Sequence, residues 1–169
     1  YSEEEEIAFF ERAWDLLPEK GFRQYEVSNH AREGYTCIHN VNTWRMHEWI
    51  GVGPSASSQF GRRRWTEPHS LDEWLAGLDG GGAGPVEAVD LTPSMLAEDY
   101  LIFGLRMNEG VDPGAWERRF PGSLPPAWPE LADSLQREGL AVAEGNRFRL
   151  TRRGRLLADR IGAAILEGS

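Results

Sequence analysis

The sequence predicts a mixed α+β and α/β fold, in which an α/β first part precedes a mainly helical second part. A helical pattern, a short loop and a strand-like run follow one another over residues 2–28, the order typical of α/β proteins. A glycine-rich run interrupts the chain at residues 79–85. Helical patterns then dominate and are followed by a strand hairpin. We therefore expect one domain over 1–79, a linker over 80–90 and a second domain over 91–169.

Length and composition suit a folded protein and argue against a membrane span. The chain has 169 residues, of which 40% are hydrophobic, and this is enough for a real core. No stretch approaches the roughly 20 consecutive apolar residues that a membrane span needs. The chain opens on YSEEEE, so no basic and then apolar signal peptide is visible.

Charge and cysteine content narrow the partners and the compartment. The formal net charge of −9 argues against general nucleic-acid affinity, because phosphate neutralisation supplies most such binding. The single cysteine rules out an internal disulfide framework and suits a reducing compartment. We therefore expect a cytoplasmic protein.

The first element is predicted to be an amphipathic helix. Ser2 and Glu5 have the spacing of a capping box at its start. Apolar residues then recur at helical spacing: Ile7, Phe10, Trp14 and Leu17. Pro18 is expected to end the helix. A strand over 22–28 follows, which favours the helix–loop–strand order of a parallel sheet.

The stretch from Tyr25 to Ser58 concentrates the groups that chemistry would use. It holds the only cysteine, three of the four histidines and several asparagines, in a polar loop between two strand-like runs. Turns use such side chains to bond their own backbone, which is the structural alternative. The loop also carries Tyr35, Trp44 and Trp49. Rings mixed with histidine and asparagine suit a flat, partly polar ligand such as a porphyrin or a base, unless they only cover the end of the sheet.

The metal and nucleophile motifs in this stretch are weak. Cys37-x-His39 lacks the two further ligands that a zinc site needs. A catalytic role for Cys37 would rest only on a nearby histidine. Gly51-x-Gly53 resembles part of a dinucleotide fingerprint but lacks the third glycine and the following helix. The residues themselves thus predict no zinc site and no catalytic residue.

Residues 49–58 are predicted to be a buried strand whose small side chains allow another group to approach the backbone closely. In a barrel or open sheet, residues 54–58 at its carboxyl end would face a ligand. The basic run Arg62–Arg64 suits contacts with carboxylates or phosphates, although surface arginines near a turn are commoner. Another helix is predicted from Ser70, with Glu73 completing a capping box.

The second part is predicted to contain four helices and a hairpin. The helix starts are marked by Thr92-Pro93, Asp112-Pro113, Pro129 and Thr151. The inner face of the first helix is predicted to be the stripe Leu96, Tyr100, Phe103 and Met107. The hairpin has strands over 141–144 and 147–150, joined by Gly145-Asn146.

Helices followed by a small hairpin resemble a winged-helix module, which offers a nucleic-acid or protein-binding alternative. The helix in the recognition position carries mostly acidic side chains: Glu130, Asp133 and Glu138 against Arg137. Such a face would repel phosphates. Arginines do gather on the hairpin and the start of the last helix, at positions 147, 149, 152, 153 and 155. These arginines leave nucleic-acid binding as an alternative hypothesis, ranked below roles in packing and solubility.

Several runs in fixed order give the chain a family resemblance over nearly its whole length. YEVSNHAREGYTCIHNVNTW, EWIGVGPSASS and GRRRW resemble the downstream part of oxygen-independent coproporphyrinogen III oxidase-like proteins, which are radical-SAM proteins. EDYLIFGLRMNEGVD, LQREGLAV and RFRLTRRGRLLAD resemble that family's C-terminal helical domain. The run HNVNTW is similar to the HNxxYW signature of the heme-chaperone branch, with Thr43 in place of the tyrosine.

The resemblance implies a fold and also identifies what this chain lacks. It implies the last strands and helices of a partial (β/α) radical-SAM barrel, followed by a mostly helical, winged-helix-like C-terminal domain. The family's CxxxCxxC run holds a [4Fe–4S] cluster through three thiolates and leaves one iron open for S-adenosylmethionine. A chain with one cysteine has no such run. We therefore expect a C-terminal fragment, consistent with the non-methionine start, that is inactive alone.

The resemblance also implies a ligand and the residues that would meet it. If the full-length protein is a heme chaperone, His39 is the best candidate for the ligand to the heme iron. Asn40 lies beside it in the sequence, and Trp44 and Tyr35 would stack nearby. The propionates would meet Arg62–Arg64. Heme or a porphyrin is thus the expected partner, whether the protein is a chaperone or a porphyrinogen oxidase.

A second group of residues is implied for the full-length protein. There, Gly53, Ser55 and Ser57 would lie near S-adenosylmethionine or the substrate. Two alternatives to a tetrapyrrole role remain. One is the winged-helix binding module, and the other is a structural lid that covers the open end of the barrel and hinges at the glycine-rich segment.

Overall fold

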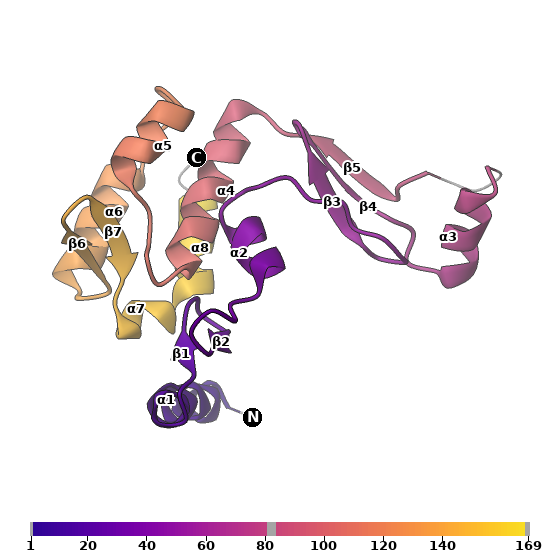
Figure 1. The fold of residues 1–169 in the computed structure, drawn as a ribbon. Coiled ribbons are helices and arrows are strands. Elements are labelled where there is room, and N and C mark those ends of the chain that lie inside the picture. Colours follow the sequence, from indigo (N-terminus) through magenta and orange to yellow (C-terminus); the bar gives the residue numbers. More distant parts are fainter. Residues whose placement is uncertain (1, 81–83, 168–169) are drawn as a thin grey trace.

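The computed structural model describes residues 2–80 and 84–167 (Figure 1). It shows a mixed α/β chain with three small sheets, which confirms the predicted fold class. Each strand pairing in the described ranges is antiparallel, so the expected parallel sheet is wrong for this part of the chain. No helix in these two ranges is both long and apolar enough to cross a membrane.

The chain forms three regions. Its elements in order are α1 (Glu3–Glu19), β1 (Arg23–Gln24), β2 (His30–Ala31), α2 (Ile38–Trp44), β3 (Ser57–Phe60), β4 (Arg63–Thr66), α3 (Leu71–Leu78), β5 (Glu87–Asp90), α4 (Pro93–Arg106), α5 (Pro113–Arg119), α6 (Trp128–Arg137), β6 (Ala141–Glu144), β7 (Arg147–Leu150), α7 (Arg152–Arg155) and α8 (Ala158–Glu167). Helix α1 lies beside the β1–β2 hairpin, and α2 joins the later helices in a compact body. The arm, residues 49–90, projects from that body (Figure 1).

The first helix begins as predicted and ends later than predicted. The Glu5 N–H donates to Ser2 Oγ at 3.2 Å, and the Ser2 N–H donates to Glu5 Oε2 at 2.8 Å. Pro18 lies inside the last turn of α1 instead of following it. The strand predicted over 22–28 shortens to the two residues of β1, which pair with β2.

Residues 29–58 differ most from the prediction. The polar loop contains a helix, α2. Beyond α2, residues 50–56 belong to no strand, and Val52 is 82% exposed, so the predicted buried strand is wrong. Gly51 has a different reason to be small. A Cβ there would overlap the Ser57 carbonyl oxygen, because the chain doubles back at this point.

The arm is held mainly by backbone pairing. Its central strand, β4, pairs with β3 on one side and β5 on the other. Strand β5 therefore occupies the end of the expected linker over 80–90, whose residues 81–83 lie outside the described ranges. The division of the chain into two domains remains a prediction. Helix α3 has the predicted Ser70 cap and contains no buried residue.

The hydrophobic core lies in the body. It is built by α4, α5, α6, α8 and the β6–β7 hairpin. The buried face of α4 is displaced by one residue from the predicted stripe. Ala97, Leu101 and Leu105 are buried, whereas Leu96 and Tyr100 pack against this core as partly buried residues.

The C-terminal end confirms the hairpin and corrects the last helix. Strands β6 and β7 pair in the predicted register, and Gly145 takes the positive φ of 60° that a glycine-first turn requires. Thr151 caps a helix as predicted, through Gly154 N–H to Thr151 Oγ1 at 3.1 Å. The single helix expected after it is two helices, α7 and α8, with a break at Leu156–Leu157.

Candidate functional site

The signature residues lie on α2, whose N-terminal end faces solvent. The side chains from Glu33 to His39 are exposed. Tyr35 is 81% exposed and Ile38 is 75% exposed, which is unusual for large apolar side chains placed together. Asn40 follows as a half-buried residue. This end of α2 therefore presents an exposed imidazole close in sequence to two exposed side chains, those of Tyr35 and Ile38.

Trp44 anchors α2 to the body. Its ring meets Phe103 edge-on, with centroids 5.5 Å apart and an interplanar angle of 73°. The Arg106 guanidinium lies over the same ring, 4.9 Å from its centroid. The buried Nε1 of Trp44 has no hydrogen-bond partner among the described residues. Trp44 thus positions the helix, and the Arg106 guanidinium covers one face of its ring.

The C-terminal end of α2 is fixed by an arginine from α5. Arg119 donates to the carbonyl oxygen of Met46 at 2.9 Å and to that of Arg45 at 3.3 Å. These contacts satisfy carbonyl groups that a helix end leaves without partners. Arg45 also pairs with Glu109, with Nη2 and Oε1 3.0 Å apart. Met46, with a positive φ of 59°, is buried at this junction.

The buried carboxylate of Glu26 lies beside Arg106, the residue whose guanidinium contacts the Trp44 ring. Glu26 is fully buried, and its Oε1 accepts hydrogen bonds from Ser28 N at 2.9 Å and Asn29 Nδ2 at 2.6 Å. Its Oε2 lies 4.0 Å from Arg106 Nε. Neither of these two atoms has a hydrogen-bond partner among the described residues, so the ion pair offsets only part of the cost of burying the charge. It ties the β1–β2 turn to α4.

The pairing of Glu26 with Arg106 was not predicted from the sequence. Glu26 lies within the YEVSNH run, which was used only to identify a family. His30 completes the turn, and burial lowers the pKa of its imidazole, while the charge of Glu26 opposes that shift. A lone acid in an apolar strand-like run was the available signal, because such a residue needs a buried partner.

A cavity of about 290 Å³ lies beside the C-terminal end of α2. Trp44 and Tyr100 supply aromatic walls, and Arg45, Arg119 and Arg147 supply positive charge. Arg119 and Arg147 donate to backbone carbonyls and have no carboxylate within 4.0 Å in the described ranges. Glu109, which pairs with Arg45, and Asp112 also line the cavity, so its positive charge without a paired acid comes from Arg119 and Arg147.

Gly53, Ser55 and Ser57 lie on the arm, in the turn that leads into β3. Gly53 has a φ of 110°, and a Cβ there would meet nothing within 4 Å. Ser55 Oγ lies 3.0 Å from His69 Nδ1, while the Ser57 carbonyl accepts from Trp49 Nε1 at 3.1 Å. Among the described residues, no hydrogen bond, ion pair or ring contact joins these three to His39. The structure thus keeps the two sets of predicted residues on different elements.

Two of the arginines expected to meet propionates, Arg62 and Arg64, instead form contacts that hold the arm in place. Arg62 Nε donates to the Leu91 carbonyl at 3.0 Å. Arg64 bonds to Gln59 and pairs with Asp99 on α4, with Nη2 and Oδ2 2.6 Å apart. The arginines that lie close to α2 are instead those of α4, α5 and β7, together with Arg45.

The residues present differ in how well they fit the cofactors that the resemblance implies. Cys37 is exposed and is the only thiol of the chain, so this chain does not fit a [4Fe–4S] cluster. Within the described ranges, no group of three His, Cys, Asp or Glu side chains is placed to hold a metal ion. A single exposed imidazole beside apolar surface fits a heme that brings its own four nitrogen ligands.

Comparison with known proteins places this geometry in a family. Residues 91–157 match the model of the HemN C-terminal domain. A zebrafish protein, radical S-adenosyl methionine domain-containing protein 1, mitochondrial, is 33% identical over 93% of this chain and 38% of its own length. Heme chaperone HemW of Mycobacterium tuberculosis is 34% identical over 89% of this chain and 36% of its own length.

A solved structure shares the fold. Coproporphyrinogen III oxidase (HemN) from Escherichia coli, a radical SAM enzyme, matches with a TM-score of 0.73 and 18% identity, over 98% of this chain and 42% of that chain. The chain thus spans about two fifths of the length of the proteins it matches. The chain therefore carries a HemN C-terminal domain, and over most of its length it is similar to radical-SAM domain-containing proteins and heme chaperones, with the fold of coproporphyrinogen III oxidase.

Proposed function

We propose that this chain is the heme-binding part of a radical-SAM heme chaperone, and that the His39 imidazole is the ligand to the heme iron. The observation that carries the proposal is the exposed imidazole on α2 beside the exposed Tyr35 and Ile38. A neutral imidazole is a common axial donor to heme iron. The apolar side chains supply surface that a flat macrocycle would cover.

A chaperone is favoured over a porphyrinogen oxidase. The M. tuberculosis relative, 34% identical over 89% of the chain, is named a heme chaperone, whereas the oxidase structure is 18% identical. The HNVNTW run agrees with the chaperone branch. Thr43 Oγ1 donates to the His39 carbonyl at 3.1 Å, so this threonine acts within α2. The role of the absent tyrosine is therefore not supplied by residue 43.

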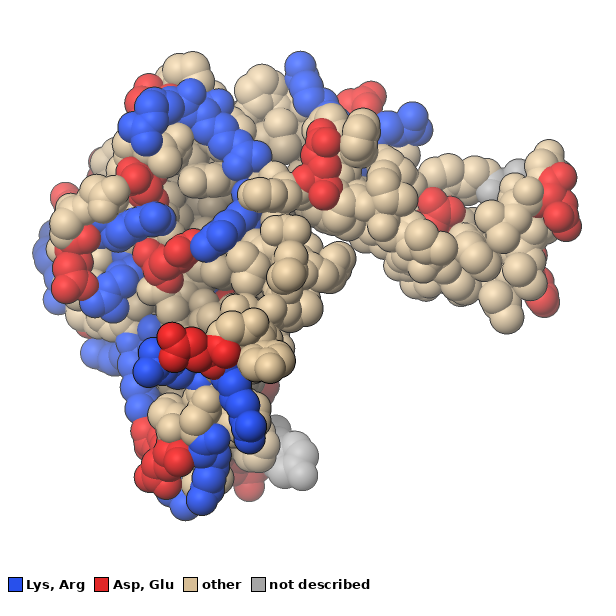
Figure 2. All heavy atoms as spheres, in the orientation of Figure 1, with Lys and Arg blue, Asp and Glu red and all other residues tan. Residues whose placement is uncertain are grey.

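The acidic groups of the ligand would meet arginines close to α2. Arg45, Arg119 and Arg147 border the cavity beside this helix, and Figure 2 shows basic side chains over this side of the body. Guanidinium groups bind carboxylates by charge-assisted hydrogen bonds. Asn40 would supply a further polar contact, and Trp44 would hold α2 in place. These arginines replace Arg62–Arg64 in the propionate-binding role.

S-adenosylmethionine and the [4Fe–4S] cluster belong, in this proposal, to the full-length protein. Gly53, Ser55 and Ser57 would lie near S-adenosylmethionine or the substrate there, and the open backbone at Gly53 suits a close approach. The chain alone would bind heme without radical chemistry. We propose a cytoplasmic location, which the free Cys37 favours, although the zebrafish relative is named as mitochondrial.

Heme titration followed by absorbance tests the ligand role. His39→Ala is expected to lose the absorbance change of the ligated iron and to weaken binding about tenfold or more, because an axial bond is removed. His69→Ala is the matched control, since His69 is exposed on the arm and does not line this cavity. Cys37→Ser excludes ligation by the neighbouring thiol. Unchanged spectra and affinity in His39→Ala would remove this residue from the site.

A further inference from the structure

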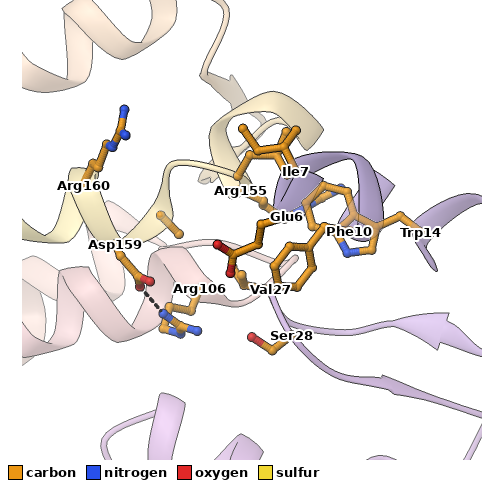
Figure 3. Close-up of a pocket in the computed structure, with 12 residues that line it drawn as sticks. Glu6, Ile7, Phe10, Trp14, Val27, Ser28, Arg106, Arg155, Asp159 and Arg160 are labelled. Atoms are coloured by element: carbon orange, nitrogen blue, oxygen red, sulfur yellow. Dashed lines mark hydrogen bonds and ion pairs between the residues drawn. The ribbon is translucent and has the colours of Figure 1, made fainter. Parts of the chain in front are cut away.

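A second cavity, of about 260 Å³, lies between α1 and the C-terminal helices. Figure 3 shows Ile7, Phe10 and Trp14 of α1 on one side of it. Arg106 and Asp159 lie on the other side and are joined by an ion pair, with Nη1 and Oδ1 2.7 Å apart. The cavity is therefore apolar on one wall and charged on the other.

Two hydrogen-bond donors in this cavity wall lack acceptors. Trp14 is 6% exposed, and its buried Nε1 has no partner among the described residues. The buried Nε of Arg155 likewise has none within the described ranges. Both residues line the cavity, and the Arg155 guanidinium lies 5.5 Å from the centroid of the Trp14 ring. Because an unmet buried donor is costly, an acceptor that reached these N–H groups would stabilise the structure.

The charge around these donors points to a negatively charged acceptor. Burial lowers the pKa of Arg155, and the nearby guanidinium groups of Arg149 and Arg152 lower it further. Arg152 pairs with Asp15 at 2.5 Å, and Arg149 pairs with Glu144. Arg155 has no carboxylate within 4.0 Å in the described part of the chain. An anion beside it would favour its charged form.

We propose that this cavity binds a small monocarboxylate with an apolar body. The carboxylate would accept hydrogen bonds from Trp14 Nε1–H and Arg155 Nε–H, and the body would lie against Ile7 and Phe10. Glu6 and Asp159 also border the cavity, and their negative charge disfavours dianions such as inorganic phosphate. None of the residues that line this cavity belongs to α2.

Benzoate is a suitable probe, and the indole signal of Trp14 is a direct readout. In ¹H–¹⁵N spectra of the 169-residue chain, Trp14→Phe assigns the Nε1–H signal. Benzoate added at constant ionic strength is expected to shift this signal along a saturable curve. Phosphate at equal concentration is expected to shift it several-fold less. No heme is present, so the result does not depend on the heme proposal.

Two arginines of α7 give the matched comparison. Arg155→Gln is expected to weaken benzoate binding about tenfold, the loss of one charge-assisted hydrogen bond. Arg153→Gln is expected to leave the affinity unchanged, because Arg153 is exposed and does not line the cavity. Arg155→Lys keeps the charge without the Nε donor and should bind with intermediate affinity. A non-saturable shift, or equal affinity in the three variants, would show that the donors are met by water alone and would overturn the proposal.

Discussion

The body and the arm of this molecule are stabilised in different ways. In the body, the helices beyond residue 91 and the β6–β7 hairpin surround one cluster of buried apolar side chains. In the described part of the arm, the buried residues are Ser58, Gln59 and Pro68. Large apolar side chains of the arm face solvent instead: Ile50, Val52, Phe60, Leu71, Leu75, Leu78, Val86 and Val89. Figure 2 shows the arm as a mostly uncharged surface.

The difference teaches where the stability of the chain resides. Apolar burial is the main favourable term in folding, so the body can hold itself together. The arm depends on a ladder of backbone hydrogen bonds and on polar anchors. One anchor is the pair between Arg64 and Asp99, and another is the bond from Gly51 N–H to Ser58 Oγ at 2.9 Å. The following predictions test this division, from the largest expected effect to the smallest.

Removing leucine side chains should separate the two regions most clearly. Leu101 is 2% exposed in the core, and Leu101→Ala is expected to lower the free energy of unfolding by about 2–5 kcal/mol. Leu75 is 46% exposed on α3, and Leu75→Ala should change that free energy by less than about 0.5 kcal/mol. Urea unfolding followed by circular dichroism measures both. Similar losses for the two variants would contradict the division.

Adding one methyl group should show the same contrast. A Cβ at Gly154 would overlap the Leu140 carbonyl, so Gly154→Ala is expected to cost about 1–3 kcal/mol. A Cβ at Gly84 would meet nothing within 4 Å, and Gly84→Ala should be neutral or stabilise by up to about 1 kcal/mol. Neither glycine has a positive φ, so steric contact is what differs. Thermal melting of the two variants measures both effects. A Gly154→Ala variant as stable as the wild type would show that close packing at this glycine does not contribute to the stability of the body.

Breaking the anchor between arm and body should loosen the arm alone. The Arg64 and Asp99 side chains are mostly buried, at 27% and 17% exposure. Asp99→Asn is expected to cost about 1 kcal/mol, because one hydrogen bond changes from charged to neutral. Hydrogen exchange should accelerate several-fold in β4 and β5, while the core amides of α4 keep their protection. Asp72→Asn on exposed α3 is the control. Equal acceleration in arm and core would mean that the regions unfold together.

The half-buried His30 of β2 should add a small pH dependence. The pKa of His30 is lowered below 6.5 by burial, so the unfolded chain binds more protons between the folded pKa and 6.5. Stability therefore falls as the pH falls through that window, and this loss is complete below the folded pKa. The pKa of Asp112 is lowered below 3.8, mainly by the hydrogen bond from the Ala115 N–H. Its titration therefore does not contribute to the pH dependence in the window of His30.

The pH dependence can be isolated by substitution. His30→Asn should flatten the slope of the unfolding free energy against pH below 6.5, whereas His47→Asn at an exposed position should retain it. Urea unfolding at a series of pH values supplies the measurement. A slope that survives in His30→Asn would assign the pH dependence to another group.

Local hydrogen bonding explains which elements the sequence could predict. The caps at Ser2, Ser70, Thr92, Asp112 and Thr151 were all found, because each side chain bonds a backbone N–H three residues away. The hairpin was found for the same reason, since its turn residues lie between strands that pair with each other. Where a structure depends on neighbours in sequence, the residues carry the signal.

Non-local contacts explain what the sequence could not predict. Strand β5 pairs with β4 across the glycine-rich stretch, so its partner lies more than twenty residues away. Helix α2 has no side-chain cap and no buried residue, so it leaves no local pattern. The site residues on α2 were identified by resemblance, while Arg106 and Arg119 were missed because only the tertiary fold brings them to this helix.

The contact between Arg119 and the end of α2 shows that this helix depends on the body. A helix of seven residues without a buried face is too short to persist by itself. Its last carbonyls are held by a side chain whose own backbone belongs to α5, and whose guanidinium lies over Tyr100 and Phe120. The order of α2 therefore depends on the packed body, and a substitution that loosened α5 would also loosen the helix that carries His39.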